Sequence, residues 1–172
     1  MKSYSQALKI LKKSKILFTD DYVKTSMCLN RVCAMDIFSK TNLPAANNSA
    51  FDGYAINSKD TKKLNSKNGK LFKVIGSIAA GSKPKNYKIK KFETFEIMTG
   101  GLIPKGCDAI VPKEKVMFHL LKKKTRFITI KEKILKNKNV RFKGSDFKKN
   151  QLLIKKGTIL NSNHILALKA LG

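Results

Sequence analysis

The chain has 172 residues, 42% of them hydrophobic, a composition that suits one globular domain or two small ones. Its formal net charge is +26, which is extreme for this length. No apolar run approaches the ~20 residues that a membrane-spanning helix needs, and the N-terminal residues lack the apolar core of a signal peptide. The composition therefore excludes a membrane-spanning helix, and we expect a cytoplasmic protein with no membrane partner.

The excess of basic residues has two possible meanings. A strongly basic chain can bind nucleic acid or another anionic partner. However, only Arg31, Arg126 and Arg141 of the 37 basic residues are arginines, whereas base readers and phosphate clamps favour the planar guanidinium group. The lysines are also scattered along the chain, which is typical of a solvated surface. We expect no specific nucleic-acid binding, and a basic nucleic-acid-binding protein is the alternative.

The three cysteines, Cys28, Cys33 and Cys107, show no CxxC spacing. A sparse and odd set is typical of free thiols in a reducing compartment. We interpret each cysteine as a small buried apolar residue.

In chain order, the first predicted elements are two helices. Residues 5–17 carry an apolar stripe opposite lysines, and Ser3 or Ser5 can cap this amphipathic helix. Residues 20–28 form the second predicted helix, and Asn30 can adopt the left-handed conformation that ends a helix. Because a helix as short as the first is marginal alone, we expect it to pack on another element.

Alternating apolar residues predict a series of strands, followed by a terminal helix. The predicted strands cover residues 31–38, 71–78, 92–98, 109–111, 116–121, 126–130 and 152–154, and the helix covers residues 164–171. Residues 116–130 form a predicted hairpin whose tip is the basic run 122–124. Because strands outnumber helices, and the helices cluster at both ends, we expect a β-rich α+β fold.

Turn-forming residues are concentrated between positions 43 and 60. Asn48 and Ser49 can fold their side chains onto the backbone, and Asp52-Gly53 is a turn signal because glycine accepts a positive φ. Tyr54 then begins an alternating strand. Asp52 could simply close its own turn, or the loop could hold this carboxylate still for chemistry.

A second corner follows the strand predicted at residues 92–98. Thr99-Gly100-Gly101 could present backbone N–H groups to an anion, or it could be an ordinary hairpin turn. It lacks the spacing of a phosphate-binding P-loop, so the pattern alone leaves both interpretations open.

Three blocks, in order along the chain, resemble the signatures of one enzyme family. They are NSAFDGYA (48–55), IMTGGLIPKGCDAIVPKE (97–114) and NVRFKGSDFKKNQLLIKKGTIL (139–160). The family is that of the molybdopterin molybdenumtransferases, which comprises the bacterial MoeA-like enzymes and the E domain of gephyrin. Two departures stand out: Phe51 replaces a methionine of the family pattern, and Ser145 replaces a glutamate, which removes any acidic contact at that position.

The resemblance implies a fold of two lobes, with a β-rich lobe inserted into a smaller α+β lobe. Residues 1–20 would hold the N-terminal helix. Residues 21–46 and 138–172 would form the discontinuous first lobe, and residues 47–137 the inserted lobe. The resemblance also implies that the pterin-binding and C-terminal domains of the family are absent from these 172 residues.

The resemblance further implies a role in molybdenum cofactor biosynthesis. The family inserts molybdenum from molybdate into adenylylated molybdopterin with the help of Mg²⁺, and AMP leaves. A molybdopterin adenylyltransferase would supply the substrate, and the complete enzyme would be a homodimer with its active site across the subunit interface. The present region would then carry half of a composite site and be inactive alone. A scaffold or interaction module like the gephyrin E domain is the alternative.

The residues that match family positions important for activity are Asp52 and Thr99. Both are predicted to be catalytic, Asp52 as a carboxylate ligand or orienter of Mg²⁺ and Thr99 as a hydrogen-bond partner of a substrate phosphate. Thr99 is also predicted to bind substrate, together with Gly100 and Gly101. Asn48, Ser49 and Tyr54 complete the predicted substrate-binding set, as residues that fix the loop.

Overall fold

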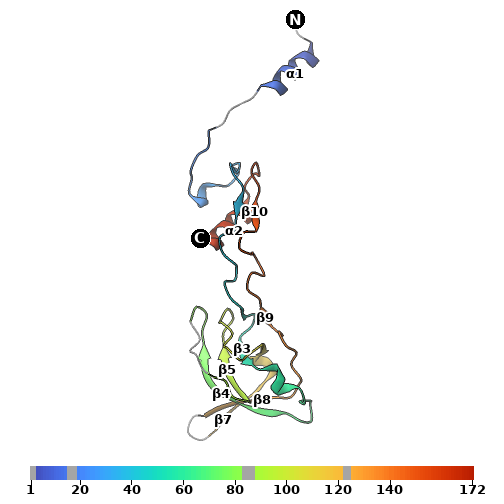
Figure 1. Cartoon of the computed structure of the whole chain (residues 1–172), viewed down its shortest axis with the longest axis vertical. Helices are drawn as coiled ribbons and strands as arrows, with labels where there is room; N and C mark the ends of the chain where they lie inside the picture. Colours follow the sequence, from blue (N-terminus) through green and yellow to red (C-terminus); the bar gives the residue numbers. More distant parts are fainter. Residues whose placement is uncertain (1–2, 15–18, 83–87, 122–124) are drawn as a thin grey trace. The chain divides into compact units, whose positions relative to one another are not determined.

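The computed structural model describes residues 3–14, 19–82, 88–121 and 125–172 (Figure 1). It divides into two compact units. The terminal unit is Met1–Ile37 with Leu152–Gly172, and the central unit is Phe38–Gln151. The element order is β-rich, with one helix near each end, so the predicted α+β class is confirmed. The lobe limits inferred from the resemblance stay a prediction.

In the terminal unit, α1 (Tyr4–Lys13) begins at a capping box. The Ser3 hydroxyl accepts from the Gln6 N–H, and the Gln6 side chain accepts from the Ser3 N–H, so two of the unpaired N–H groups of the first turn are satisfied. No residue of α1 is buried. The helix predicted at residues 5–17 is confirmed as far as Lys13, and residues 15–17 of that prediction lie outside the described residues.

Two predictions for the following segment are wrong. The helix predicted at residues 20–28 is irregular chain with a single 3₁₀ turn, η1 (Thr25–Met27). The strand predicted at residues 31–38 is reduced to β1 (Ile37–Phe38) and an isolated bridge from Val32 to Ile159. The segment between residues 20 and 28 has no alanine and several residues that lose rotamer freedom in a helix, so its intrinsic helix propensity is low. None of these residues is buried, so little packing is available to stabilise a short helix there.

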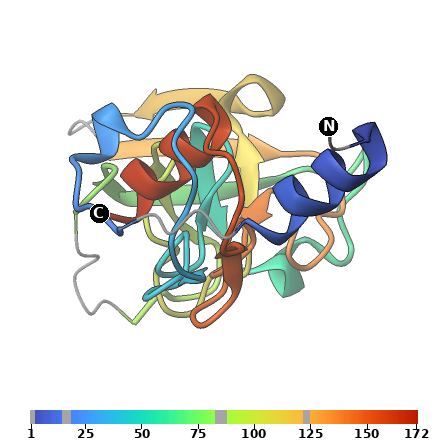
Figure 2. The same cartoon turned by 90° about the horizontal axis from the view of Figure 1, so that it is seen from above.

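The terminal unit closes on a small core. Cys33, Ile154 and Leu160 are buried together. Asn30 has the predicted left-handed backbone, with φ 62°, and donates its N–H to the Leu160 carbonyl at 2.8 Å. β10 (Leu152–Ile154) pairs with β1, and Asn161 caps α2 (Ser162–Leu171), the red helix that ends at the C-terminus in Figure 2.

The central unit is built on one six-stranded sheet in the order β6-β3-β5-β4-β8-β7, and its strands are drawn in the lower part of Figure 1. The strands are β3 (Gly53–Ile56), β4 (Lys70–Ile78), β5 (Glu93–Ile97), β6 (Ala109–Pro112), β7 (Met117–Leu121) and β8 (Thr125–Ile130). Only β4 and β5 pair in parallel; the other neighbours are antiparallel. The predicted strands of this region are confirmed, and the basic hairpin tip at residues 122–124 lies outside the described residues.

Strand β3 contributes to both faces of this sheet. Tyr54 and Ile56 belong to one buried cluster, whereas Ala55 between them belongs to the other. This alternation follows from the two-residue period of a strand. The β3 backbone is therefore held from both sides and by both neighbouring strands, and it forms a rigid support for the turn that precedes it.

Short elements attach the loops to this sheet. They are β2 (Asn48–Ser49), which pairs with β9 (Val140–Arg141), and the 3₁₀ turns η2 (Ser58–Thr61) and η3 (Lys113–Lys115). Within the part of the chain that the structure describes, no helix is long and apolar enough to cross a membrane.

Candidate functional site

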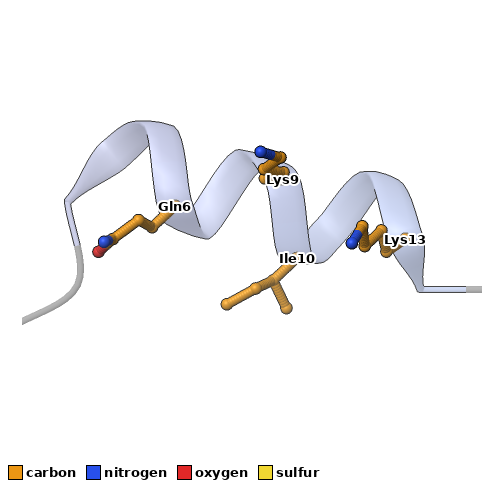
Figure 3. Close-up of a pocket in the computed structure, with 4 residues that line it drawn as sticks. All are labelled: Gln6, Lys9, Ile10 and Lys13. Atoms are coloured by element: carbon orange, nitrogen blue, oxygen red, sulfur yellow. The ribbon is translucent and has the colours of Figure 1, made fainter.

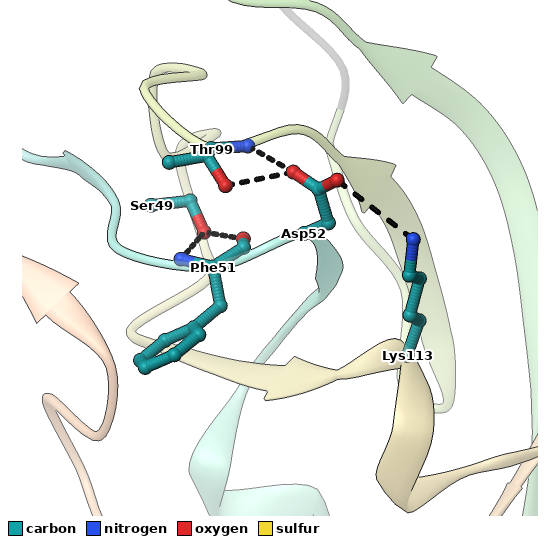
Figure 4. A network of polar contacts seen from close by, with 5 residues as sticks. All are labelled: Ser49, Phe51, Asp52, Thr99 and Lys113. Atoms are coloured by element: carbon teal, nitrogen blue, oxygen red, sulfur yellow. Dashed lines mark hydrogen bonds and ion pairs between the residues drawn. The ribbon is translucent and has the colours of Figure 1, made fainter.

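The Asp52 turn and the Thr99 corner meet in the structure (Figure 4). Asp52 Oδ1 accepts two hydrogen bonds from Thr99, one from its backbone N–H and one from its hydroxyl, each 2.7 Å long. The register of the sheet explains the meeting, because Gly53 pairs with Ile97 in the antiparallel β3–β5 ladder. The residues just before β3 therefore lie beside the residues just after β5.

The electrostatics of this corner favour an ionised carboxylate. Hydrogen bonding to a carboxylate stabilises its charged form. The backbone N–H of Thr99 lowers the pKa of Asp52 most strongly, followed by the Thr99 hydroxyl, with partial burial opposing them and Lys113 assisting. Asp52 is therefore charged at neutral pH and can only accept hydrogen bonds or ligate a cation.

The second carboxylate oxygen is oriented toward a lysine. Lys113 Nζ lies 3.9 Å from Asp52 Oδ2, and the Lys113 backbone N–H donates to the Asp52 carbonyl at 3.1 Å. The Lys113 side chain is 61% exposed and the Asp52 side chain 43% exposed, so water reaches both groups. Sequence reasoning missed Lys113, and its position directly after Pro112 inside the second signature block was the only available signal.

Gly53 does not use the positive φ that makes Asp52-Gly53 a turn signal. Gly53 is not among the positive-φ residues; it is needed for close approach instead. A Cβ atom at this position would lie 2.1 Å from the Val111 carbonyl oxygen, because β6 pairs with β3 at Gly53 and Pro112. Because Gly53 has no side chain, β6 can lie close to β3. Lys113, which directly follows β6, is therefore placed beside Asp52, which directly precedes β3.

Ser49 and Asn48 lie on the first arm of the turn. The Ser49 hydroxyl donates to the Phe51 carbonyl at 2.5 Å and accepts from the Phe51 N–H at 3.3 Å, which closes the turn just before Asp52. Figure 4 shows the Phe51 ring directed away from the Asp52 carboxylate. Asn48 is only 9% exposed, and its Oδ1 has no hydrogen-bond partner among the described residues.

The amides of the glycine corner are engaged within the chain. Gly100 N–H donates to the Ser49 carbonyl at 2.8 Å, and Gly101 N–H donates to the Met98 carbonyl at 2.8 Å. Ser49 N–H in turn donates to the Gly101 carbonyl at 2.9 Å. These bonds join the corner to the Asp52 loop. The predicted substrate-binding roles of Gly100 and Gly101 stay predictions. To bind a substrate through its N–H group, each glycine would have to break the hydrogen bond that it makes within the chain.

Tyr54 is directed into the sheet core. It is buried with Ile56 in one cluster, and its strand neighbour across the ladder is Glu96. Burial raises the pKa of Tyr54, with Glu96 adding to the rise and Arg126 opposing it. Arg126 donates to Glu96 at 2.6 Å. The structure therefore places Tyr54 under the turn as part of its support, and its predicted role in fixing the loop stays a prediction.

Metal ligands are sparse in this region. Over residues 3–14, 19–82, 88–121 and 125–172, no three His, Cys, Asp or Glu side chains come together as a metal cage. Mg²⁺ does not need such a cage, because it commonly binds one or two carboxylates together with waters and substrate phosphates. The ionised Asp52, whose side chain is 43% exposed, fits that second kind of site.

The fold, with Asp52 and Thr99 hydrogen-bonded where β3 begins and β5 ends, is that of a known protein family. A family profile described as the MoeA N-terminal region (domain I and II) matches residues 2–172. The chain therefore belongs to the MoeA N-terminal family.

Similar proteins share one name. A molybdopterin molybdenumtransferase of Staphylococcus epidermidis is 31% identical over 170 residues, which are 99% of this chain and 39% of that protein. The Staphylococcus aureus protein of the same name is 35% identical over 144 residues, 84% of this chain and 33% of the relative. The chain thus spans roughly a third to two fifths of the curated relatives that it matches.

Solved structures agree with this assignment. A crystal structure of a molybdopterin biosynthesis moeA protein from Pyrococcus horikoshii matches with a TM-score of 0.80 and 32% identity, over 98% of this chain and 41% of that one. A second structure of a moeA protein from the same organism gives a TM-score of 0.79 at 31% identity, over 87% of this chain and 38% of that one.

Proposed function

We propose that this chain acts in molybdenum cofactor biosynthesis as the N-terminal region of a molybdopterin molybdenumtransferase. The reaction transfers molybdenum from molybdate into adenylylated molybdopterin and releases AMP. One observation carries the proposal: a charged carboxylate, Asp52, is held through Oδ1 by two hydrogen bonds from Thr99, and its Oδ2 faces Lys113 in a side chain that is 43% exposed. A fixed anion with one open oxygen is suited to position a hard cation beside phosphate oxygens.

The two predicted catalytic residues, Asp52 and Thr99, would have different roles. Asp52 would hold Mg²⁺ through Oδ2, and the bound ion would supply positive charge to the diphosphate of the substrate. Thr99 donates its hydroxyl proton to Asp52 in this structure, so the same proton is not available to a phosphate. Thr99 would therefore act first by orienting Asp52, and a direct phosphate contact would require its hydroxyl to turn.

The other predicted site residues would hold this arrangement. Ser49 closes the turn through Phe51, and Gly100 and Gly101 join the corner to the loop. Asn48 would offer its unpaired Oδ1 to a water or donor that enters beside the loop. We also propose that the complete site lies across a homodimer interface. An adenylyltransferase would supply the substrate, and the protein would act in the cytoplasm.

The decisive experiment replaces Asp52 by asparagine in the full-length protein. Asn keeps the shape and one acceptor oxygen for Thr99 but removes the charge. We expect molybdenum insertion at limiting Mg²⁺ to fall by about 100-fold or more, the size typical of losing one preorganised electrostatic group. Asp21→Asn, which removes an exposed partner of Arg31 in the terminal unit, is the matched control and should leave the rate unchanged. An Asp52→Asn enzyme with full activity would disprove the metal role.

A further inference from the structure

The two oxygens of the Asp52 carboxylate have different partners (Figure 4). Oδ1 receives both hydrogen bonds from Thr99, whereas Oδ2 is oriented toward Lys113 Nζ at 3.9 Å. That separation is beyond the range of a hydrogen bond, so the ammonium acts here by charge alone. The oxygen that Thr99 leaves without a hydrogen bond is therefore the oxygen that faces the lysine.

The backbone and the side chain of Lys113 differ in freedom. Its N–H donates to the Asp52 carbonyl, and the preceding Pro112 pairs with Gly53 in the β3–β6 ladder. The Cα atom is thus fixed beside the turn. The side chain is 61% exposed, and its flexible stem can carry the ammonium several ångströms without moving the backbone.

We propose that Lys113 is an exchangeable counter-ion of Asp52. The ammonium neutralises Oδ2 until a divalent cation binds there, and it then moves onto a phosphate oxygen of the anionic substrate. A lysine has three N–H donors and no acceptor, so it competes with a cation for Oδ2 but acts together with that cation on a phosphate. The proposal rests on the proposed function, since it takes the diphosphate-bearing substrate class from it.

This role predicts effects of opposite sign when the charge of Lys113 is removed. Cation binding at Asp52 should become tighter, because its competitor is gone. Diphosphate binding should become weaker, because one positive group is lost. Exposed ion pairs contribute little free energy, so each change should be about two- to fivefold. A lysine that merely supports the turn would weaken both kinds of binding together.

The test uses ¹H–¹⁵N NMR spectra of this chain and the Lys113→Gln variant. Mn²⁺ alone is the cation probe, and the readout is broadening of the Thr99 amide, which is hydrogen-bonded to Asp52. Inorganic pyrophosphate in the presence of Mg²⁺ is the anion probe. Lys113→Gln should need about two- to fivefold less Mn²⁺ for half-broadening and about two- to fivefold more pyrophosphate for half-saturation.

Two further variants sharpen the result. Lys115 is an exposed lysine of the same short turn η3, and Lys115→Gln should change neither titration. Lys113→Arg keeps the charge and should retain pyrophosphate binding. Equal effects of the two glutamine variants, changes of the same sign for both probes, or no change at all would overturn the proposal. So would unaltered Thr99 broadening at every Mn²⁺ concentration. The Asp52→Asn molybdenum-insertion assay tests the proposed function separately: a strong loss there together with no effect of Lys113→Gln would overturn the counter-ion role and leave the proposed function standing.

Discussion

Thr99 binds one oxygen of Asp52 twice, through its N–H and its hydroxyl, although the two residues are 47 positions apart in the chain. The backbone donor is fixed by the end of β5, and the hydroxyl donor depends on the Thr99 side chain. A substitution at Thr99 can therefore remove the hydrogen bond from the hydroxyl, whereas the hydrogen bond from the backbone N–H remains. This division allows the contribution of each half to be measured.

The pKa of Asp52 tests that division. The wild-type carboxyl should titrate below its ordinary value of 3.8. Thr99→Val should move the pKa upward but not fully to that value, because the backbone N–H remains as the larger cause. Thr99→Ser keeps a hydroxyl and should titrate like the wild type. Carboxyl ¹³C shifts followed by NMR across the acidic range would measure all three, and identical curves for Thr99→Val and wild type would contradict the prediction.

The same shift determines how stability depends on pH. A carboxyl whose pKa is lower in the folded chain than in the unfolded chain stabilises the fold above its unfolded pKa. That contribution is lost as the pH falls from about 3.8 through the lower folded value. We therefore expect the difference in free energy of unfolding between wild type and Asp52→Asn to be constant at neutral pH and to shrink below pH 3.8. Urea titrations at several pH values would measure it, and a difference that grows on acidification would contradict the sign.

Gly53 should tolerate no side chain. A Cβ atom would overlap the Val111 carbonyl oxygen in the middle of a paired ladder, so Gly53→Ala must push β3 and β6 apart. We expect a loss of at least about 2 kcal/mol in the free energy of unfolding. Gly81→Ala is the control in the same unit, since Gly81 has a φ of 76° but open space around it. It should cost only the ~1 kcal/mol of the left-handed conformation. Urea unfolding would rank the two, and the reverse order would contradict the explanation.

Cys107 should be an unreactive thiol. Burial raises the pKa of Cys107 to about 12, with Asp108 and Asp60 adding to the rise. Since the thiolate is the reactive form, alkylation by iodoacetamide at pH 8 should be much slower in the folded chain than in urea. Mass spectrometry of the peptide that contains Cys107 would follow the time course. Equal rates in the folded and unfolded chain would show that the thiol is accessible.

The helix α1 should contribute little to the stability of the remaining chain. None of its residues is buried, and the four residues that line the hollow in Figure 3, Gln6, Lys9, Ile10 and Lys13, all come from this one helix. Deleting residues 1–14 should therefore change the free energy of unfolding of the rest by less than about 0.5 kcal/mol. Circular dichroism during urea unfolding would measure this. A larger loss would reveal packing of α1 in solution.

Local patterns alone determined much of this protein. Apolar alternation located β4, a short apolar run located β6, and the capacity of asparagine for left-handed backbone located the bend at Asn30. The local pattern left the roles of Asp52 and Thr99 open, and the resemblance of the signature blocks to a known family indicated them as site residues. These features depend on a few neighbouring residues, so they are visible in a linear chain.

Only the tertiary structure decided which atoms meet. The register of β3 against β5 and β6 brings Thr99 and Lys113 to different oxygens of Asp52, and it requires Gly53 for close approach rather than for its φ. A ladder register is set by contacts across the whole sheet, and no short stretch of sequence contains that information.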